Sequence, residues 1–390
     1  MLLSYCTNVH PAEDFDGVIR QLREYAGPIR RTAARDILGV GLWLPANLAR
    51  QLAGNAEDRQ ALREVLDEEG LQLHTINAFP YGGFHNEVVK LEVYKPTWAQ
   101  RERLEYTMDC AEVLAAFLPE GTAGSISTLP LAWREPWSQQ DDDAATSAFA
   151  ELSSRLRQLR ERTGKTVRIA VEPEPGCVLD TVADVVTWLG ARIPRGIDPE
   201  FVGLCVDTCH LAVSFADPAG AVRQIDAAGL RIVKVQASAA LHVTDPAEPA
   251  AREALAAFVE PRYLHQVRES QGAGVIAADD LSDALADLPG QDPWRVHFHI
   301  PLHHVPQAPL ETTVDVLRRT VAEIEGLAYA PEVHLDIETY TWSVLPGASV
   351  GITDGIAAEI AWAEANLLGA SASAAASASA PVPPAVRGAS

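Results

Sequence analysis

Short apolar runs alternate with longer amphipathic stretches along most of this chain. The apolar runs are of β type, and the longer stretches repeat apolar residues every three to four positions, as one face of a helix does. Strands that alternate with helices indicate βαβ units and a parallel sheet. The predicted strands are Leu2–Thr7, Ile37–Leu44, Leu71–Asn77, Gly124–Leu129, Val167–Val171, Val202–Val206, Arg231–Gln236, Val296–Ile300 and Val333–Ile337. The predicted helices are Phe15–Tyr25, Arg59–Glu69, Gln100–Phe117, Ala148–Thr163, Thr181–Ile193, Pro218–Ala227, Ala251–Val259, Leu310–Glu325 and Ile356–Leu368.

The number of repeated units favours a closed (β/α)₈ TIM barrel over an open sheet. At 390 residues the chain could form one large barrel or two ordinary domains. Nine strands are predicted, one more than an eight-stranded barrel needs. Because the interval from Gln236 to Arg295 is long, we place Val296–Ile300 in an excursion after the seventh strand. No glycine-rich phosphate loop follows the first strand, which argues against a nucleotide cofactor. We predict a barrel over residues 1–368 and a disordered, low-complexity Ala/Ser/Pro tail over residues 369–390.

Composition narrows the class of partner. The formal net charge is −22, and an acidic surface repels phosphodiester backbones, so we expect no nucleic-acid partner. We expect no membrane span and no signal peptide, because the sequence has no apolar run of sufficient length and no basic leader. The five cysteines are scattered without metal-site spacing, which fits a reducing cytoplasm.

Acidic residues and histidines gather where the predicted strands end. The carboxyl ends of barrel strands meet at one face, where TIM-barrel enzymes carry their active sites. Carboxylate oxygens and imidazole nitrogens are ligands for divalent cations, and this set fits Mn²⁺, Mg²⁺, Co²⁺ or Zn²⁺. The predicted metal ligands are Glu172, Asp207, His297, His299 and Glu338. Glu174 is expected nearer the mouth, and His303 and His304 are weaker candidates.

Other polar residues are expected to bind substrate. These are Asn8, His10, Asn77, His210 and Gln236. The segment 78–85 joins a Gly-Gly pair to aromatic residues, which is typical of a loop that closes over a ligand. Lys90, Lys95 and Trp98 could complete such a lid and contact an anionic ligand, or they could be ordinary solvated lysines and a loop aromatic.

The strand-end residues resemble those of the xylose isomerase-like TIM-barrel superfamily, which includes sugar isomerases, ketose 3-epimerases and endonuclease IV-type enzymes. That pattern has a glutamate after strand five, a DxxH after strand six, a histidine after strand seven and a glutamate after strand eight. Glu172, Asp207 with His210, and Glu338 match, whereas Gln236 replaces the strand-seven histidine. The His297-Phe298-His299 segment resembles the DxH of endonuclease IV-type members.

Longer stretches are similar to a narrower branch that is linked to the traffic of secondary metabolites. They are Tyr5–Pro11, Asn77–Gly82, Val171–Gly176 and Tyr263–Val267. The resemblance implies a small-molecule metabolite as ligand and association with other proteins of the same pathway. Three functions stay open: a metal-dependent isomerase or epimerase of a sugar-like carbonyl compound with Glu172 and Glu338 as catalytic residues, a metabolite-binding protein without turnover, or a metal-dependent hydrolase or lyase.

Overall fold

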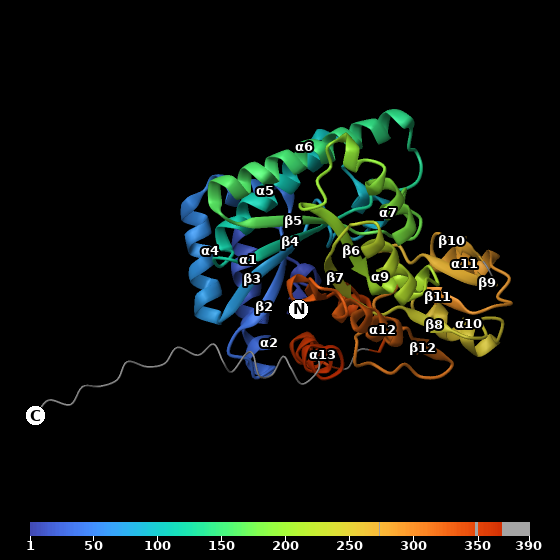
Figure 1. Cartoon of the computed structure of the whole chain (residues 1–390). Coiled ribbons are helices and arrows are strands. Elements are labelled where there is room, and N and C mark those ends of the chain that lie inside the picture. Colours follow the sequence, from blue (N-terminus) through green and yellow to red (C-terminus); the bar gives the residue numbers. More distant parts are fainter. Residues whose placement is uncertain (273, 348–349, 369–390) are drawn as a thin grey trace, which may run out of the picture.

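The computed structural model describes residues 1–272, 274–347 and 350–368 of the chain. Eight parallel strands close into a barrel in the order β1-β13-β7-β6-β5-β4-β3-β2, so the first strand pairs with the last (Figure 1). The predicted TIM barrel is therefore confirmed. The barrel strands are β1 Leu2–Cys6, β2 Leu38–Trp43, β3 Leu71–Asn77, β4 Ala123–Thr128, β5 Thr166–Val171, β6 Val202–Asp207, β7 Ile232–Ala237 and β13 His334–Ile337.

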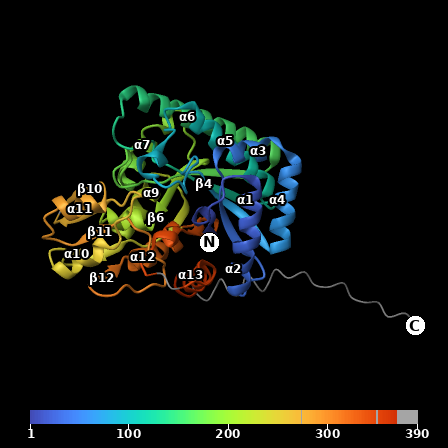
Figure 2. The same cartoon turned by 180° about the vertical axis from the view of Figure 1, so that it is seen from behind.

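Helices cover the outside of the barrel, as Figures 1 and 2 show from opposite sides. Side-chain caps fix where several begin: Ser138 and Asp141 form a capping box at α6, and Thr181 and Asp184 form one at α7. The helices are α1 Phe15–Gln21, α2 Gly27–Thr32, α3 Ala46–Gly54, α4 Ala56–Glu69, α5 Arg101–Phe117, α6 Gln139–Thr163, α7 Val182–Gly190, α8 Thr208–Val213, α9 Pro218–Ala227, α10 Pro249–Ala256, α11 Leu281–Asp287, α12 Val314–Glu325 and α13 Ile352–Leu367. A π-helical segment, Leu22–Ala26, joins α1 to α2.

The barrel interior is partly polar. Lys234 on β7 and Asp336 on β13 form a fully buried ion pair, with Nζ 2.8 Å from Oδ2. The Ser4 hydroxyl donates to the other Asp336 oxygen at 2.6 Å. On β2, a Cβ at Gly41 would collide with the Asp336 carboxylate, so the glycine leaves room for it. Because alternate strand residues point the same way, this ion pair lies one layer below Glu338.

An excursion between β7 and β13 forms a second sheet, which lies to one side of the barrel (Figures 1 and 2). The sheet is antiparallel in the order β10-β9-β11-β8-β12 and has its own apolar core around Trp294 and Phe298. Its strands are β8 Leu241–Val243, β9 Val267–Gln271, β10 Gly274–Ala278, β11 Trp294–Val296 and β12 Leu310–Thr312. The expected excursion is thus present, but its sheet was not predicted.

Two element predictions in the excursion were wrong. Of the predicted strand Val296–Ile300 only Val296 is in a strand, as the last residue of β11. His297 still donates to the Gln266 carbonyl in register with β9, but the Phe298 N–H turns back to the Val296 carbonyl at 2.8 Å and the Ile300 N–H donates to the Ala239 carbonyl at 2.8 Å. The predicted helix Leu310–Glu325 begins only at Val314, since Leu310–Thr312 pairs with β8. The predicted tail, 369–390, lies outside the described residues. None of the helices in the described part of the chain is long and apolar enough to cross a membrane.

Candidate metal centre

Three buried carboxyl groups meet at the carboxyl ends of the barrel strands. Glu172 follows β5, Asp207 ends β6 and Glu338 follows β13. One oxygen from each lies within 4.8 Å of the others. Three acids so close in a buried site repel one another when ionised, and a cation among them would remove that repulsion.

Hydrogen bonds hold two of these carboxyls and leave oxygens facing inward. The side-chain amides of Asn8 and Asn77 donate to Glu338 Oε1 at 2.7 and 2.8 Å. Asp207 Oδ1 accepts from the Ser238 hydroxyl at 2.8 Å. Asp207 Oδ2 and Glu172 Oε2 have no hydrogen-bond partner among the described residues. Buried oxygens left without donors are what a metal-binding site requires, so this donor set fits a divalent cation.

Burial also shifts the protonation of the carboxyls. Burial, with the nearby Asp207 carboxylate, raises the pKa of Glu338 to about 8. Burial and the Glu338 carboxylate raise the pKa of Glu172 well above its ordinary value. At neutral pH the group therefore carries at least one proton, which a bound cation would displace.

The His299 imidazole is oriented as a fourth ligand. Its Nδ1 lies 2.6 Å from the Glu338 carbonyl oxygen, an acceptor, so Nδ1 carries the proton and Nε2 carries the lone pair. His299 Nε2 lies 3.8 Å from Asp207 Oδ2 and has no hydrogen-bond partner in the described part of the chain. Burial lowers the pKa of His299 to about 4, so the ring is neutral at neutral pH. A neutral imidazole whose other nitrogen binds a carbonyl is the usual arrangement of a metal-ligating histidine.

The lone pairs of two further imidazoles, those of His210 and His297, face each other. His210 Nδ1 lies 2.9 Å from the Pro173 carbonyl, and His297 Nδ1 lies 2.5 Å from Gln266 Oε1. Both partners accept, so both Nδ1 atoms are protonated and both Nε2 atoms carry lone pairs. The two Nε2 atoms are 3.1 Å apart. A shared proton, or a metal ion bound by both nitrogens, would relieve the repulsion between these lone pairs.

Glu174 completes this second group. Its Oε1 accepts from the Tyr94 hydroxyl at 2.7 Å and from Gln266 Nε2 at 2.9 Å. Because the Gln266 amide nitrogen faces Glu174, its oxygen is the atom that faces His297. One ligand atom each of Glu174, His210 and His297 lies within 4.8 Å of the others, so these residues could hold a second ion. His297 therefore lies in this group rather than beside the three carboxyls.

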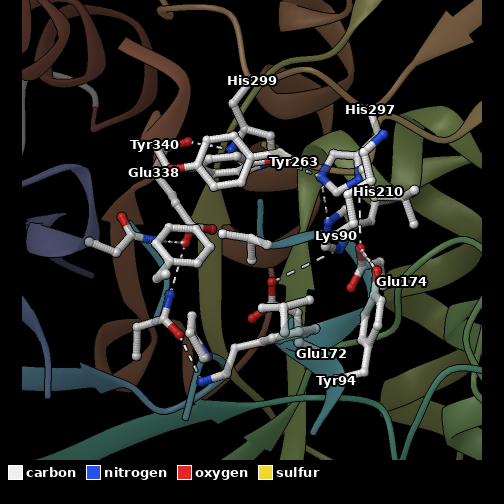
Figure 3. Close-up of a pocket in the computed structure, with 18 residues that line it drawn as sticks. Lys90, Tyr94, Glu172, Glu174, His210, Tyr263, His297, His299, Glu338 and Tyr340 are labelled. Atoms are coloured by element: carbon white, nitrogen blue, oxygen red, sulfur yellow. Dashed lines mark hydrogen bonds and ion pairs between the residues drawn. The ribbon is translucent and has the colours of Figure 1, made fainter. Parts of the chain in front are cut away.

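Side chains of both groups line one cavity (Figure 3). It receives side chains from the barrel, from the 79–94 segment and from the excursion. Its lining residues are Asn8, Asn77, Phe79, Pro80, Phe84, Val89, Lys90, Val93, Tyr94, Glu172, Glu174, His210, Tyr263, Leu264, His297, His299, Glu338 and Tyr340.

Several predicted site residues lie outside this lining. His10 is buried and stacks on Tyr25, with ring centroids 4.4 Å apart. Gln236 is fully buried inside the barrel, level with Asp207 and Asp336 in the strand register, and both its amide atoms lack a partner among the described residues. Trp98 packs in the core on Phe149. Lys95, which pairs with Glu92, and the loop residues His303 and His304 also do not line the cavity.

Sequence reasoning missed Tyr94 and Gln266, which fix Glu174 and His297, and the cavity-lining Tyr263. The metabolite-traffic resemblance included Tyr263 and Gln266 without a role for either. No strand-end pattern marks Tyr94, because it lies on a short 3₁₀ helix, Lys90–Tyr94. Cys209 is fully buried, with Sγ within 4.8 Å of a ligand nitrogen of both His297 and His299.

The fold and this donor set define a TIM barrel with a potential metal centre at the carboxyl ends of its strands. The chain belongs to the xylose isomerase-like TIM barrel family, which it matches over residues 29–320. Comparison with curated proteins finds no match.

The solved structures found by comparison share little sequence with the chain. A D-psicose 3-epimerase in the presence of D-fructose is 13% identical, with a TM-score of 0.48 over 95% of this chain and 100% of that one. A xylose isomerase domain protein from Alicyclobacillus acidocaldarius is 14% identical, with a TM-score of 0.43 over 92% and 95%. An IolI protein with a bound zinc atom is 12% identical, with a TM-score of 0.39 over 61% and 73%.

Proposed function

We propose that this protein is a divalent-metal-dependent isomerase or epimerase of a sugar-like carbonyl compound. The observation that carries the proposal is the meeting of Glu172 and Glu338 on one cavity, buried and with raised pKa values. Carboxyl groups whose pKa values are raised above the ordinary range can both remove and return a proton. Isomerisation and epimerisation next to a carbonyl require those two transfers.

The three carboxyls at the strand ends and the His299 imidazole would hold the ion. Glu172, Asp207, Glu338 and His299 would bind it, and Mn²⁺, Mg²⁺, Co²⁺ and Zn²⁺ all accept such donors. A bound divalent ion polarises a carbonyl and makes the adjacent C–H more acidic.

The protein's own groups would carry the proton. In this proposal Glu172 takes the proton from the carbon next to the carbonyl, and Glu338 returns one to the product. Asn8 and Asn77 hold the Glu338 carboxyl in place through Oε1. His210 lies beside Glu172 on the cavity, where its Nε2 lone pair can accept a hydrogen bond from a substrate hydroxyl.

Elemental analysis of protein purified without chelator or metal-affinity resin tests the metal centre. We expect a near-stoichiometric ion that Glu172→Gln and Glu338→Gln each lose. Glu92→Gln is the matched control, because Glu92 is exposed and outside the cavity lining, and it should keep the ion. In ²H₂O, ion-loaded protein should exchange the C–H next to the carbonyl of a sugar-like substrate. Wild-type protein that takes up no ion even after incubation with Mn²⁺ or Zn²⁺ would overturn the proposal.

From the narrower resemblance we propose that the substrate is a secondary metabolite. Four stretches similar to the metabolite traffic protein EboE each contribute a lining residue to the cavity: Asn8, Asn77, Glu172 and Tyr263. We propose an EboE-like role that involves other proteins of the same pathway. All five cysteines are unpaired, which supports a reducing, cytoplasmic location.

The opposed His210 and His297 lone pairs favour a second candidate function. If a second metal ion lies between them, two neighbouring ions could activate water, as in metal-dependent hydrolases. A chromogenic phosphoesterase screen with and without chelator tests this alternative, which predicts chelator-sensitive turnover. Saturable metabolite binding without product formation would instead indicate a binding protein.

A further inference from the structure

The cavity has two chemically different parts. Around the proposed ion it is lined by carboxyls, imidazoles and amides. Much of the remaining wall is apolar and comes from the loop after β3 and from the excursion, with Phe79, Phe84, Val89, Val93 and Leu264. Hydroxyl groups placed against these side chains would lose water without gaining hydrogen bonds.

An aromatic cluster holds this wall in place. Phe84 lies 5.2 Å from Tyr263 and 5.6 Å from Tyr340 between ring centroids, and the two tyrosine rings are 4.9 Å apart. The three rings come from the loop after β3, from the excursion and from the segment after β13. Tyr340 also packs 4.7 Å from the His299 ring, so the apolar wall begins beside the proposed ion.

Charge disfavours a phosphorylated substrate. Lys90 is the cationic side chain of the lining, and it is ion-paired with Asp280. Three glutamates line the same cavity. A phosphate group would find no guanidinium or unpaired ammonium group among these lining residues and would approach carboxylates.

We propose that the substrate is uncharged and has two parts, an α-hydroxycarbonyl end and an apolar ring or hydrocarbon part. This inference rests on the proposed function. The oxygenated end lies at the ion between Glu172 and Glu338. The apolar part lies against Phe84, Val93 and Leu264, so a free ketohexose, with hydroxyls along its length, fits the wall poorly.

Binding of simple hydroxyketones to Mn²⁺-loaded protein tests the inference. The probes are hydroxyacetone, 2-hydroxyacetophenone, D-fructose and D-fructose 6-phosphate, each titrated by calorimetry. We expect the phenyl compound to bind at least about tenfold more tightly than hydroxyacetone, because it adds apolar surface at the wall. Both sugars should bind more weakly than the phenyl compound, and the phosphate most weakly.

Variants of the apolar cavity wall test whether the preference for the phenyl compound arises there. Val93→Thr keeps the volume but adds a hydroxyl, and Phe84→Ala removes a ring, so both should bring the ratio of phenyl-compound to hydroxyacetone affinity close to one. Val88→Ala is the matched control, because Val88 is exposed on the same loop and outside the lining. Using both wall variants keeps the test valid if Phe84→Ala fails to fold.

The outcomes separate this inference from the proposed function. Equal affinity for hydroxyacetone and 2-hydroxyacetophenone, or tighter binding of either sugar than of the phenyl compound, would overturn the two-part substrate and leave the metal-dependent isomerase standing. An unchanged phenyl preference in both wall variants would also overturn it. Protein that binds neither Mn²⁺ nor any probe would overturn both proposals.

Discussion

The barrel and the excursion each supply part of the candidate metal centre, but they position their residues differently. The barrel contributes Glu172, Asp207 and Glu338 at or just beyond the ends of ladder-paired strands. The excursion contributes His297 and His299 from an irregular segment after β11. A strand end needs only its register to be placed, whereas an irregular segment needs individual hydrogen bonds.

Those hydrogen bonds are specific. The His299 ring is held by the Glu338 carbonyl of the barrel, and the His297 ring by Gln266 of the excursion. The excursion therefore joins the centre through side-chain contacts, while the barrel joins it through its backbone ladder. We expect changes in the barrel to affect stability and the ion together, and changes in the excursion to affect mainly the ion.

We expect the largest effect on stability when the buried ammonium group of Lys234 is removed from the barrel. Lys234→Met leaves the Asp336 carboxylate buried without its partner, which should lower the free energy of unfolding by about 3–5 kcal/mol. Lys234→Met combined with Asp336→Asn should recover much of this loss. Glu260→Gln in the excursion is the comparison, because the amide keeps an acceptor oxygen for the Arg262 and Tyr263 N–H groups and leaves no buried charge unpaired, so it should matter less. Urea unfolding measures all four proteins, and equal losses for Lys234→Met and Glu260→Gln would contradict the difference between the regions.

A buried barrel histidine should make stability depend on pH. Burial lowers the pKa of His74 from 6.5 to about 4, so the unfolded chain takes up the proton first as the pH falls. Above pH 6.5, His74 does not lower the free energy of unfolding. Below pH 6.5 the free energy of unfolding falls, and the loss should reach about 3 kcal/mol at pH 4. His74→Leu should remove this part of the pH dependence. Unfolding curves at pH 7.5 and pH 4.5 measure it, and an unchanged difference between the two pH values would exclude the effect.

Metal affinity should separate the two regions directly. Asp207→Asn removes a charged barrel ligand and should weaken ion binding by more than about 100-fold, whereas His299→Asn should weaken it by roughly 10- to 100-fold. Competition with a fluorescent chelator gives both constants. If His299→Asn costs more than Asp207→Asn, the excursion rather than the barrel dominates the centre.

The smallest expected effect concerns the residue that orients His297. Gln266→Leu removes the acceptor for His297 Nδ1 and the amide donor to Glu174, so His297 loses its fixed protonation. We expect about a tenfold loss of any second ion, with the stoichiometry of the first ion unchanged. Titration with Zn²⁺ resolves the two steps, and loss of the first ion in this variant would contradict the division into two groups.

The sequence predicted the barrel because its strands and helices have distinct periods, and strand ends carry Glu172, Asp207 and Glu338. It did not predict the excursion sheet, because strands as short as Leu241–Val243 are too brief to show alternation. Pairing of His297 with His210 also escaped prediction, since no sequence spacing encodes a contact across 87 positions. Gln236 was placed on the right strand, but its depth below the cavity depends on the barrel register.

Closure of the barrel by its first and last strands bears on the order of events during synthesis. Asn8 leaves the ribosome well before its partner Glu338, which follows the last barrel strand. His299 likewise waits for the Glu338 carbonyl. A nascent chain that ends before Glu338 cannot assemble the proposed metal centre. Binding of the proposed ion would therefore occur only after β13 has been translated. Truncated chains would reach quality-control proteases without an ion to stabilise them.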